Sequence, residues 1–269
     1  MISLTDQEFL ELSGYFKANY GVNLEKKRTL IEGRLSHYVS TLGFKCFNDY
    51  FNFVKKDPTG KELSCMIDRL TTNHTFFMRE EEHFVLFQNT ILPWIDNTLK
   101  EKSLRIWSAG CSSGEEPYAL SMIIFDYIKK HPGDWDTTVL ATDISTKALQ
   151  LGQNGEFHSE ELNHLCDEWK KDYFTKIDDI SYKVKSKLRE NVIFRTFNLL
   201  DDFPRKKTFH TIFCRNVMIY FDNDTKTEIV NKFYNSICDG GYFIIGHSES
   251  LSSLENDFTY ISPSVYPKE

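Results

Sequence analysis

The chain has 269 residues, of which 41% are hydrophobic and 14% aromatic, so it can bury one full core and a smaller second domain. A formal net charge of −7 gives no general attraction to nucleic acid or to an anionic membrane surface. The six cysteines lie far apart, with no C-x-x-C pair and no histidines at zinc-finger spacing, which disfavours a metal site and indicates reduced structural thiols.

The N-terminal part of the chain has the apolar spacing of helices. Thr5 and Glu8 have the pattern of a capping box that opens a first helix, and Gly21 ends it. Three more apolar stripes follow at helical intervals, at residues 31–42, 47–54 and 63–70. The N-terminus lacks the pattern of a signal peptide, and no apolar run approaches the roughly 18 residues of a membrane span. We therefore expect a cytoplasmic protein without membrane insertion.

A further helical segment runs from Glu80 to about Leu99, where Pro93 is expected to kink or interrupt it. The four preceding helices should pack together as a small bundle, because each has one apolar stripe to bury. We therefore predict an N-terminal helical domain over residues 1–78 and a linker helix over residues 79–103.

From Leu104 onward, short apolar strands alternate with helices, which is typical of a mostly parallel sheet covered on both faces. Strands are predicted at Leu104–Ser108, Thr138–Thr142, Val192–Phe197, His210–Cys214, Tyr242–Gly246 and around Tyr260–Tyr266. Helices are predicted at Glu116–Lys130, Ser145–Gln153 and Asp224–Cys238. Residues 156–190 interrupt this α/β domain of residues 104–269 as a polar inserted subdomain, with a helical piece at Glu160–Phe174 and a hairpin around Ile180–Leu188.

The first predicted strand runs into a glycine-bearing turn, Ser108–Gly114, and Glu115 and Glu116 open the next helix near its positive end. Such a turn brings backbone N–H groups to a nucleotide at the carboxyl edge of the sheet. The spacing Gly110-x-x-x-Gly114 is not G-x-G-x-x-G, and a carboxylate just after the turn would repel a pyrophosphate. A cationic ligand therefore fits better than a dinucleotide, although the glycines alone are also compatible with an ordinary tight turn.

Polar residues follow the next three predicted strands at the point where each strand ends. Asp143 stands where an acid can accept both hydroxyls of an adenosine ribose, although it could instead cap the following helix. Asn198 and Leu199 follow the next strand, and Arg215 and Asn216 follow the one after that. Each could be a loop residue by itself, but together they predict one nucleoside cleft.

Five motifs are similar to those of one known family. They are Thr71–Glu80 (TTNHTFFMRE), Ile106–Tyr118 (IWSAGCSSGEEPY), Ala141–Ile144 (ATDI), Phe213–Asp222 (FCRNVMIYFD) and Gly246–Ser250 (GHSES). With them the chain resembles, nearly end to end, the CheR-type methyltransferases, which transfer a methyl group from S-adenosylmethionine to glutamate side chains of chemotaxis receptors. The resemblance implies an N-terminal helical domain followed by a Rossmann-like methyltransferase domain of seven strands, the last antiparallel, with a small inserted β subdomain.

The resemblance also implies a site. Its cofactor-binding residues are Asn73, Thr75, Arg79, Gly110, Glu116, Asp143, Asn198, Leu199, Arg215 and Asn216. The first three belong to the methionine end of S-adenosylmethionine and the active site, Glu116 to its methionine or amino portion, Asp143 to the ribose, and the last four to the adenine side and the pocket wall. Arg79 and Tyr220 would lie beside the transferred methyl group as catalytic residues. The tandem acids leave open whether Glu115 or Glu116 contacts the ligand.

This chemistry needs few protein groups, because a glutamate with a pKa of about 4.3 is ionised at neutral pH and needs no general base. The protein has to align carboxylate oxygen, methyl carbon and sulfur, and to strip water from the anion. Arg79 can pair with the incoming carboxylate, and Tyr220 can donate a hydrogen bond near the methyl group. From spacing alone, Arg79 could equally anchor a domain interface by a salt bridge, and Tyr220 could pack against a helix start.

The expected partner is the cytoplasmic helical domain of membrane-bound chemotaxis receptors, bound by a monomer. Lys26, Lys27, Arg28 and Arg34 could dock this acidic rod, or they could form an ordinary solvated helix face. A nucleic-acid methyltransferase is disfavoured by the net acidity and by the lack of an Asn/Asp-Pro-Pro-Tyr run at Asn216. A cofactor-binding sensor without catalysis remains a second alternative, and a nicotinamide oxidoreductase ranks last because its glycine fingerprint is missing.

Overall fold

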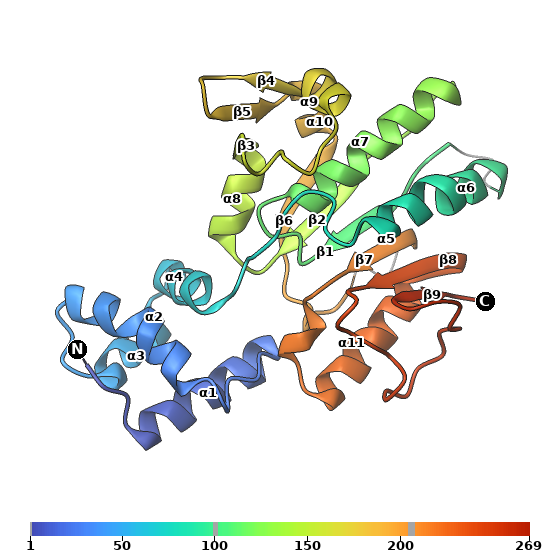
Figure 1. Cartoon of the computed structure of the whole chain (residues 1–269). Coiled ribbons are helices and arrows are strands. Elements are labelled where there is room, and N and C mark those ends of the chain that lie inside the picture. The colour runs from blue at the N-terminus through green and yellow to red at the C-terminus, as the bar shows by residue number, and fades with distance from the viewer. Residues whose placement is uncertain (1, 99–101, 204–207) are drawn as a thin grey trace.

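The structure is a computed structural model that describes residues 2–98, 102–203 and 208–269. The N-terminal helices lie together at one end of the molecule, and the central sheet with its flanking helices forms the larger part (Figure 1). Among the described residues, no helix combines the length and the apolar character needed to cross a bilayer.

Four helices form the N-terminal group: α1 (Asp6–Tyr20), α2 (Arg28–Thr41), α3 (Phe47–Lys56) and α4 (Lys61–Leu70). The capping box is confirmed, because the Thr5 side chain accepts a hydrogen bond from the Glu8 N–H while the Glu8 carboxylate accepts one from the Thr5 N–H. Gly21, at φ 71°, ends α1 as predicted. All four helices contribute to one apolar core, which includes Leu12, Ile31, Tyr50 and Met66.

The segment that follows is helical but shorter than the predicted linker helix over residues 79–103. It consists of α5 (Glu81–Leu86), a π-helical turn (Phe87–Ile91) and α6 (Leu92–Thr98). The widened turn lies just before Pro93, which has no N–H to continue an α-helical ladder. Leu99 lies outside the described residues, and Ser103 already pairs with Asp136 in an isolated β-bridge, so the helix does not extend to residue 103.

The central sheet is mostly parallel, as predicted. Its strands lie in the order β6 (Val192–Thr196), β2 (Val139–Asp143), β1 (Ile106–Ala109), β7 (Phe209–Cys214), β8 (Ile237–Ile245) and β9 (Val265–Pro267). Neighbouring strands are parallel from β6 to β8, and only β9 is antiparallel to its neighbour. Chain order reverses between β1 and β7, the position at which open α/β sheets bind ligands beyond the carboxyl ends of their strands. The Rossmann-like class is confirmed.

The number of strands differs from the prediction. The described residues contain six strands in this sheet instead of seven, and the last strand begins at Val265 instead of near Tyr260. Thr259 and Ile261 do donate backbone hydrogen bonds to Pro267 and Val265, at 3.1 and 3.5 Å. This segment therefore runs beside β9 without forming a regular ladder.

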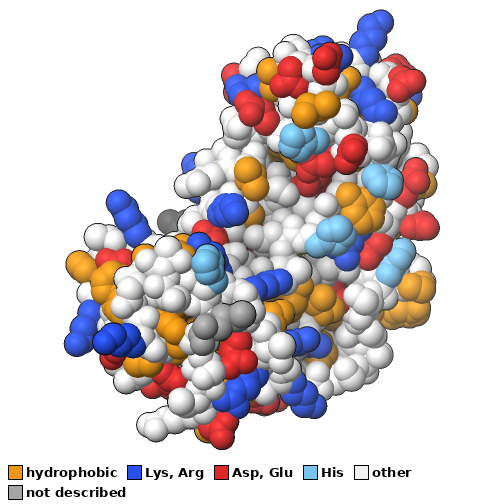
Figure 2. Space-filling model, turned by 60° about the vertical axis from the view of Figure 1, so that its left-hand side comes forward, with side chains coloured by type: hydrophobic (Ala, Val, Ile, Leu, Met, Phe, Trp, Pro, Cys, Tyr) orange, Lys and Arg blue, Asp and Glu red, His pale blue; other side chains and the backbone are white. Residues whose placement is uncertain are grey.

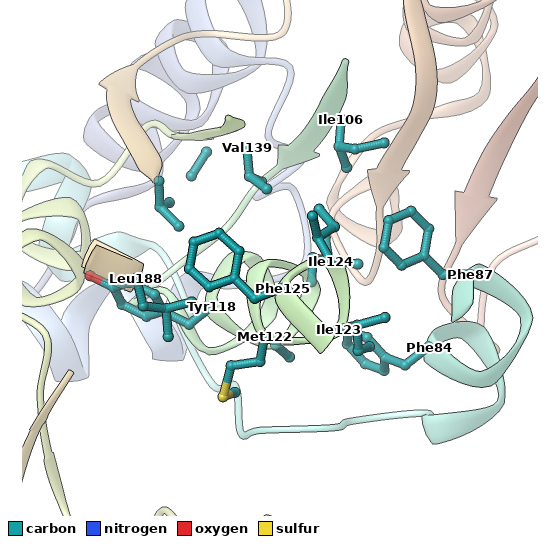
Figure 3. Packing of buried hydrophobic residues seen from close by; sticks show 14 of the residues in the cluster. Phe84, Phe87, Ile106, Tyr118, Met122, Ile123, Ile124, Phe125, Val139 and Leu188 are labelled. Atoms are coloured by element: carbon teal, nitrogen blue, oxygen red, sulfur yellow. The ribbon is translucent and has the colours of Figure 1, made fainter. Parts of the chain in front are cut away.

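Helices cover both faces of the sheet. The helices α7 (Glu115–Lys130) and α8 (Thr146–Asn154) pack on one face, and α11 (Asn223–Ser236) packs on the other. Side chains of α7 pack against three neighbours (Figure 3). These are Ile106 and Val139 of the sheet, Phe84 and Phe87 of the linker segment, and Leu188. Each Phe or Leu in such a core stabilises the fold by about 1.5–3 kcal/mol relative to an exposed side chain. This packing fixes the linker segment, and with it the residues just before α5, against the sheet.

The inserted subdomain is present between α8 and β6. It contains β3 (Glu156–His158), α9 (Asp167–Tyr173), β4 (Phe174–Lys176), β5 (Ser181–Val184) and α10 (Ser186–Glu190), with strand order β3-β5-β4. Two details of the prediction were wrong. The helical piece covers only α9, because residues 159–165 form turns, and the hairpin joins β4 to β5, since residues 186–190 are helical.

Candidate active site

A cavity of about 510 Å³ lies at the carboxyl edge of the sheet. Its walls come from the α1–α2 connection, the segment before α5, and the loops that follow β1, β2, β6 and β7. The surface view shows a hollow between the N-terminal helices and the rest of the molecule, with Lys, Arg and His side chains around it (Figure 2). The structure brings every sequence-predicted site residue to this cavity: Asn73, Thr75, Arg79, Gly110, Glu116, Asp143, Asn198, Leu199, Arg215, Asn216 and Tyr220.

The turn after β1 requires glycine at position 110, both for its backbone conformation and for the lack of space around it. Gly110 has φ +82°, and a Cβ added there would lie 2.2 Å from Cγ2 of Val217. The N–H groups of Gly110 and Cys111 both donate to the carbonyl of Thr142, at 2.7 and 2.9 Å. These bonds tie the turn after β1 to the end of β2 and so hold two walls of the cavity together.

Asp143, at the end of β2, is 9% exposed and receives two backbone hydrogen bonds, from the N–H groups of Ser112 and Ser145 at 2.9 and 2.8 Å. Burial raises the pKa of Asp143 above its ordinary value although these bonds oppose the rise. Ser145, whose side chain accepts from the Ala148 N–H, is the cap of α8. Asp143 is therefore not the cap of that helix, and its carboxylate forms part of the cavity wall.

The structure distinguishes the two tandem acids at the start of α7. Glu116 lines the cavity and accepts hydrogen bonds from Ser108 Oγ at 2.6 Å and from Arg215 Nη1 at 2.8 Å. Glu115 is 2% exposed, is absent from the cavity wall, and accepts from Ser113 Oγ at 2.8 Å. Glu116 is thus the acid that can contact a ligand.

Glu115 makes the stability of the fold depend on pH. Burial raises the pKa of Glu115 from 4.5 to about 7, so the native state resists its ionisation. Since the folded pKa is the higher one, the stability that this group contributes is complete below pH 4.5 and is lost as the pH rises to about 7. The free energy of unfolding of Glu115→Gln, relative to that of the parent, should therefore increase by about 1–3 kcal/mol as the pH rises from 4.5 to about 7. Urea unfolding at pH 5 and pH 8 measures this gain, and an equal effect at both would contradict the assignment.

Arg215 is a buried cation that links the start of α7 to the segment just before α5. Arg215 is paired with Glu116 at 2.8 Å and with Glu80 at 3.1 Å, and the three side chains are 3%, 13% and 13% exposed. Arg215 also donates to the main-chain carbonyl of Arg79. Glu80 accepts further hydrogen bonds from the Asn216 side chain and the His247 N–H. Burial alone would raise the pKa of Glu80, but the Arg215 charge and these hydrogen bonds hold it below its ordinary value.

Arg79 lies between two residues with left-handed backbone conformations, Met78 at φ 59° and Glu80 at φ 57°. Such conformations cost on the order of 1 kcal/mol or more for residues other than glycine and persist only where the surroundings enforce them. The Arg79 side chain donates to the carbonyl of His74 at 3.0 Å and has no carboxylate within 4.0 Å among the described residues. The interpretation of Arg79 as an interface salt bridge is therefore not supported, and its guanidinium retains donors for an incoming carboxylate.

The N-terminal helices also form part of the site. The Asn23 N–H donates to the carbonyl of Tyr220 at 2.8 Å, and Val22 pairs with Phe221 in an isolated β-bridge. Tyr220 therefore lies where the α1–α2 connection meets the loop after β7. Asn73 likewise spans the two parts, because its side chain donates to Ser145 Oγ at 3.1 Å.

Sequence reasoning assigned no role to two acids, Glu80 and Glu249, that organise the site. The carboxylate of Glu249 accepts from the N–H groups of Gly246, Asn216 and Ile219, at 2.7, 2.8 and 3.2 Å. Burial raises the pKa of Glu249 in spite of these bonds. Both acids belong to motifs used for the resemblance, which was the only signal that could have found them.

Glu80, His83 and His247 form a cluster whose potential ligand atoms lie within 4.8 Å of one another. Both ring nitrogens of His83 are buried without a hydrogen-bond partner among the described residues, and burial lowers the pKa of His83 to about 3. The Glu80 oxygen that faces His83 also holds the guanidinium of Arg215, and that positive charge would repel a divalent cation. We therefore assign no metal to this cluster.

The four predicted docking cations differ in their surroundings. Arg28 pairs with Asp6, and Arg34 donates to the carbonyls of Leu70 and Thr71 at the end of α4. Lys26 and Lys27 are exposed and have no ion pair within 4.0 Å in the part of the chain that the structure describes. Only these two cations are thus fully available to a partner.

Comparisons with known proteins give one consistent result. Residues 7–71 match the family model "CheR methyltransferase, all-alpha domain", and residues 73–266 match "CheR methyltransferase, SAM binding domain". A chemotaxis protein methyltransferase of Borreliella burgdorferi is 40% identical over 272 residues, covering 99% of this chain and 96% of the relative. That of Escherichia coli is 34% identical, covering 98% of this chain and 92% of the relative.

Proposed function

Because the chain belongs to the CheR methyltransferase family, we propose that it transfers the methyl group of S-adenosylmethionine to glutamate side chains of membrane-bound chemotaxis receptors. The products are glutamate methyl esters and S-adenosylhomocysteine, and we propose that the protein acts as a cytoplasmic monomer. The observation that carries this proposal is the convergence of all the sequence-predicted site residues on one cavity at the switch point of the sheet.

The residues around the cavity fit this ligand. A volume of about 510 Å³ falls in the range of roughly 300–1,000 Å³ of small-molecule sites. The carboxylates of Glu116 and Asp143 suit a cationic amino acid and the two hydroxyls of a ribose. The turn after β1 also lacks the glycine pattern that binds a pyrophosphate. The Oγ1 atom of Thr71 and Nε of Arg215 are buried without partners among the described residues, so two lining residues retain hydrogen-bonding capacity.

We propose roles that follow these positions. Glu116 binds the methionine portion, Asp143 the ribose, and Asn198 and Leu199 the adenine side, while Asn73 and Thr75 complete the wall at the methionine end. Gly110 permits the close turn, and Arg215 and Asn216 hold the wall after β7. The bound ligand supplies an electrophilic methyl group on a sulfonium.

Arg79 and Tyr220 are the proposed catalytic residues. The receptor carboxylate is already ionised, so neither residue has to remove a proton. Arg79 orients the carboxylate through its planar donors, and Tyr220 donates a hydrogen bond close to the methyl group. Donors that bound the anion most tightly in its ground state would slow the reaction, so their contribution has to favour the transition state.

We also propose that the chain is divided into a helical domain over residues 1–78, a linker over 79–103 and a methyltransferase domain over 104–269. The separate apolar core of α1 to α4 supports this division. Lys26 and Lys27, at the edge of the helical domain, are our proposed contacts to an acidic receptor helix, with Arg28 and Arg34 nearby. Receptor methylation is then carried out in the gap between the two domains.

The acceptor class is tested by incubating the purified protein with methyl-labelled S-adenosylmethionine and either receptor-containing membranes or nucleic acid. We expect label on a membrane protein of receptor size and none on DNA or RNA. Label on nucleic acid would favour the alternative methyltransferase, and binding of S-adenosylmethionine without transfer to any acceptor would favour a sensor.

A further inference from the structure

The cavity wall carries more positively charged than negatively charged side chains. Three cations, Lys27, Arg79 and Arg215, line it, against two carboxylates, Glu116 and Asp143. A wall with more positive than negative groups is unfavourable for a ligand that carries a sulfonium cation. A buried carboxylate behind the wall would offset this excess of positive charge.

Glu80 is placed to supply this negative charge. It does not line the cavity, but it lies 3.1 Å from the guanidinium of Arg215, which in turn lies 2.8 Å from Glu116. One cation shared between two carboxylates leaves a net charge of −1 on the buried triad. Without Glu80, Arg215 would pair with Glu116 alone, and the two charges facing the cavity would cancel.

The anchoring of Glu80 supports a directed role. Its backbone has φ 57°, and its two carboxylate oxygens receive hydrogen bonds from three different groups, on Arg215, Asn216 and His247. These contacts come from the loops after β7 and β8, so the carboxylate is held at one position relative to the cavity wall. A surface carboxylate placed there only for solubility would not need them.

We propose that Glu80 is a specificity-determining residue: by neutralising Arg215, it leaves the charge of Glu116 available and sets the preference of the site between cationic S-adenosylmethionine and S-adenosylhomocysteine. The two ligands differ by the methyl group and the positive charge on sulfur. This inference rests on the proposed function, since it assumes that both molecules bind in this cavity.

The test is calorimetric titration of both ligands into the full-length protein and its variants. Glu80→Gln keeps the size of the side chain and an acceptor for Arg215 but removes the charge. We expect its affinity for S-adenosylmethionine to fall about threefold to thirtyfold more than its affinity for S-adenosylhomocysteine. A residue with a merely structural role would weaken both ligands by the same factor, and that result would overturn the proposal.

Three further variants make the test specific. Glu82→Gln removes the same charge from an exposed position on α5, and its affinity ratio should change by less than about twofold. Glu80→Asp retains the charge and should keep the parental ratio even if both affinities drop, so a shifted ratio in this variant would overturn the proposal even if Glu80→Gln does not fold. Glu80→Gln combined with Arg215→Gln removes both members of the pair and should return the ratio toward that of the parent.

The outcomes separate this inference from the proposed function. If the parent protein binds neither ligand, the proposed function fails. If the parent binds both and Glu80→Asp shifts the ratio as far as Glu80→Gln, or the double variant does not restore it, only the role of Glu80 fails.

Discussion

Replacing Arg79 with Ala should lower the turnover number of methyl transfer by about a hundredfold or more, because one preorganised donor at a reacting anion typically contributes that much. The backbone on both sides of Arg79 is held in left-handed conformations, and its carbonyl is bonded to Arg215, so the side chain starts from a fixed position. Steady-state kinetics with receptor membranes measures the loss.

Two controls accompany this variant. Arg195, on the edge strand β6, also donates to a backbone carbonyl, that of Phe194 at 3.0 Å, and Arg195→Ala should leave turnover unchanged. Arg79→Lys keeps a positive charge without the planar pair of donors and should recover only part of the rate. Near-normal turnover in Arg79→Ala, with normal binding of S-adenosylmethionine, would remove Arg79 from the catalytic residues.

Replacing Arg215 with Ala should cost about 3–5 kcal/mol of folding free energy, because it leaves Glu80 and Glu116 as neighbouring buried carboxylates without their cation. Urea unfolding at neutral pH measures this loss. In the parent, the depressed pKa of Glu80 stabilises the fold above pH 4.5, and this contribution is lost as the pH falls through the lower, folded-state pKa.

The pH dependence of the Arg215→Ala variant should have the opposite sign. Without the cation, burial would raise the pKa of Glu80, and the stability of the variant should then fall as the pH rises above 4.5. A loss of less than about 1 kcal/mol, with an unchanged pH profile, would show that the triad is not a stabilising ion-pair network.

Much of the fold could be predicted because its signals are local. The Thr5–Glu8 capping box and the glycine that ends α1 involve residues close in sequence, and the structure confirms both. The alternation of strands and helices after Leu104 similarly identified the parallel sheet. The errors fell on the length of the linker helix, on short elements of the inserted subdomain and on the chain before β9, where tertiary contacts decide the conformation.

The candidate site, too, could be predicted only where its signals are local in the sequence. Polar residues at strand ends, such as Asp143 and Asn198, could be placed at one edge because parallel strands bring their carboxyl ends together. The pairing of Glu80 with Arg215 spans 135 positions and leaves no local pattern, so its role could not be read from spacing. The choice between Glu115 and Glu116 required the orientation of α7, since adjacent residues point about 100° apart around a helix and only one can face the cavity.

Carboxyl methylation is tested by the stability of the bond between the transferred methyl group and the receptor. Receptor membranes methylated by the purified protein are treated with mild base, and volatile methanol is collected. Release of the label as methanol is the predicted result, because methyl esters of glutamate hydrolyse under these conditions. Label that stays on the receptor after base treatment would contradict carboxyl methylation.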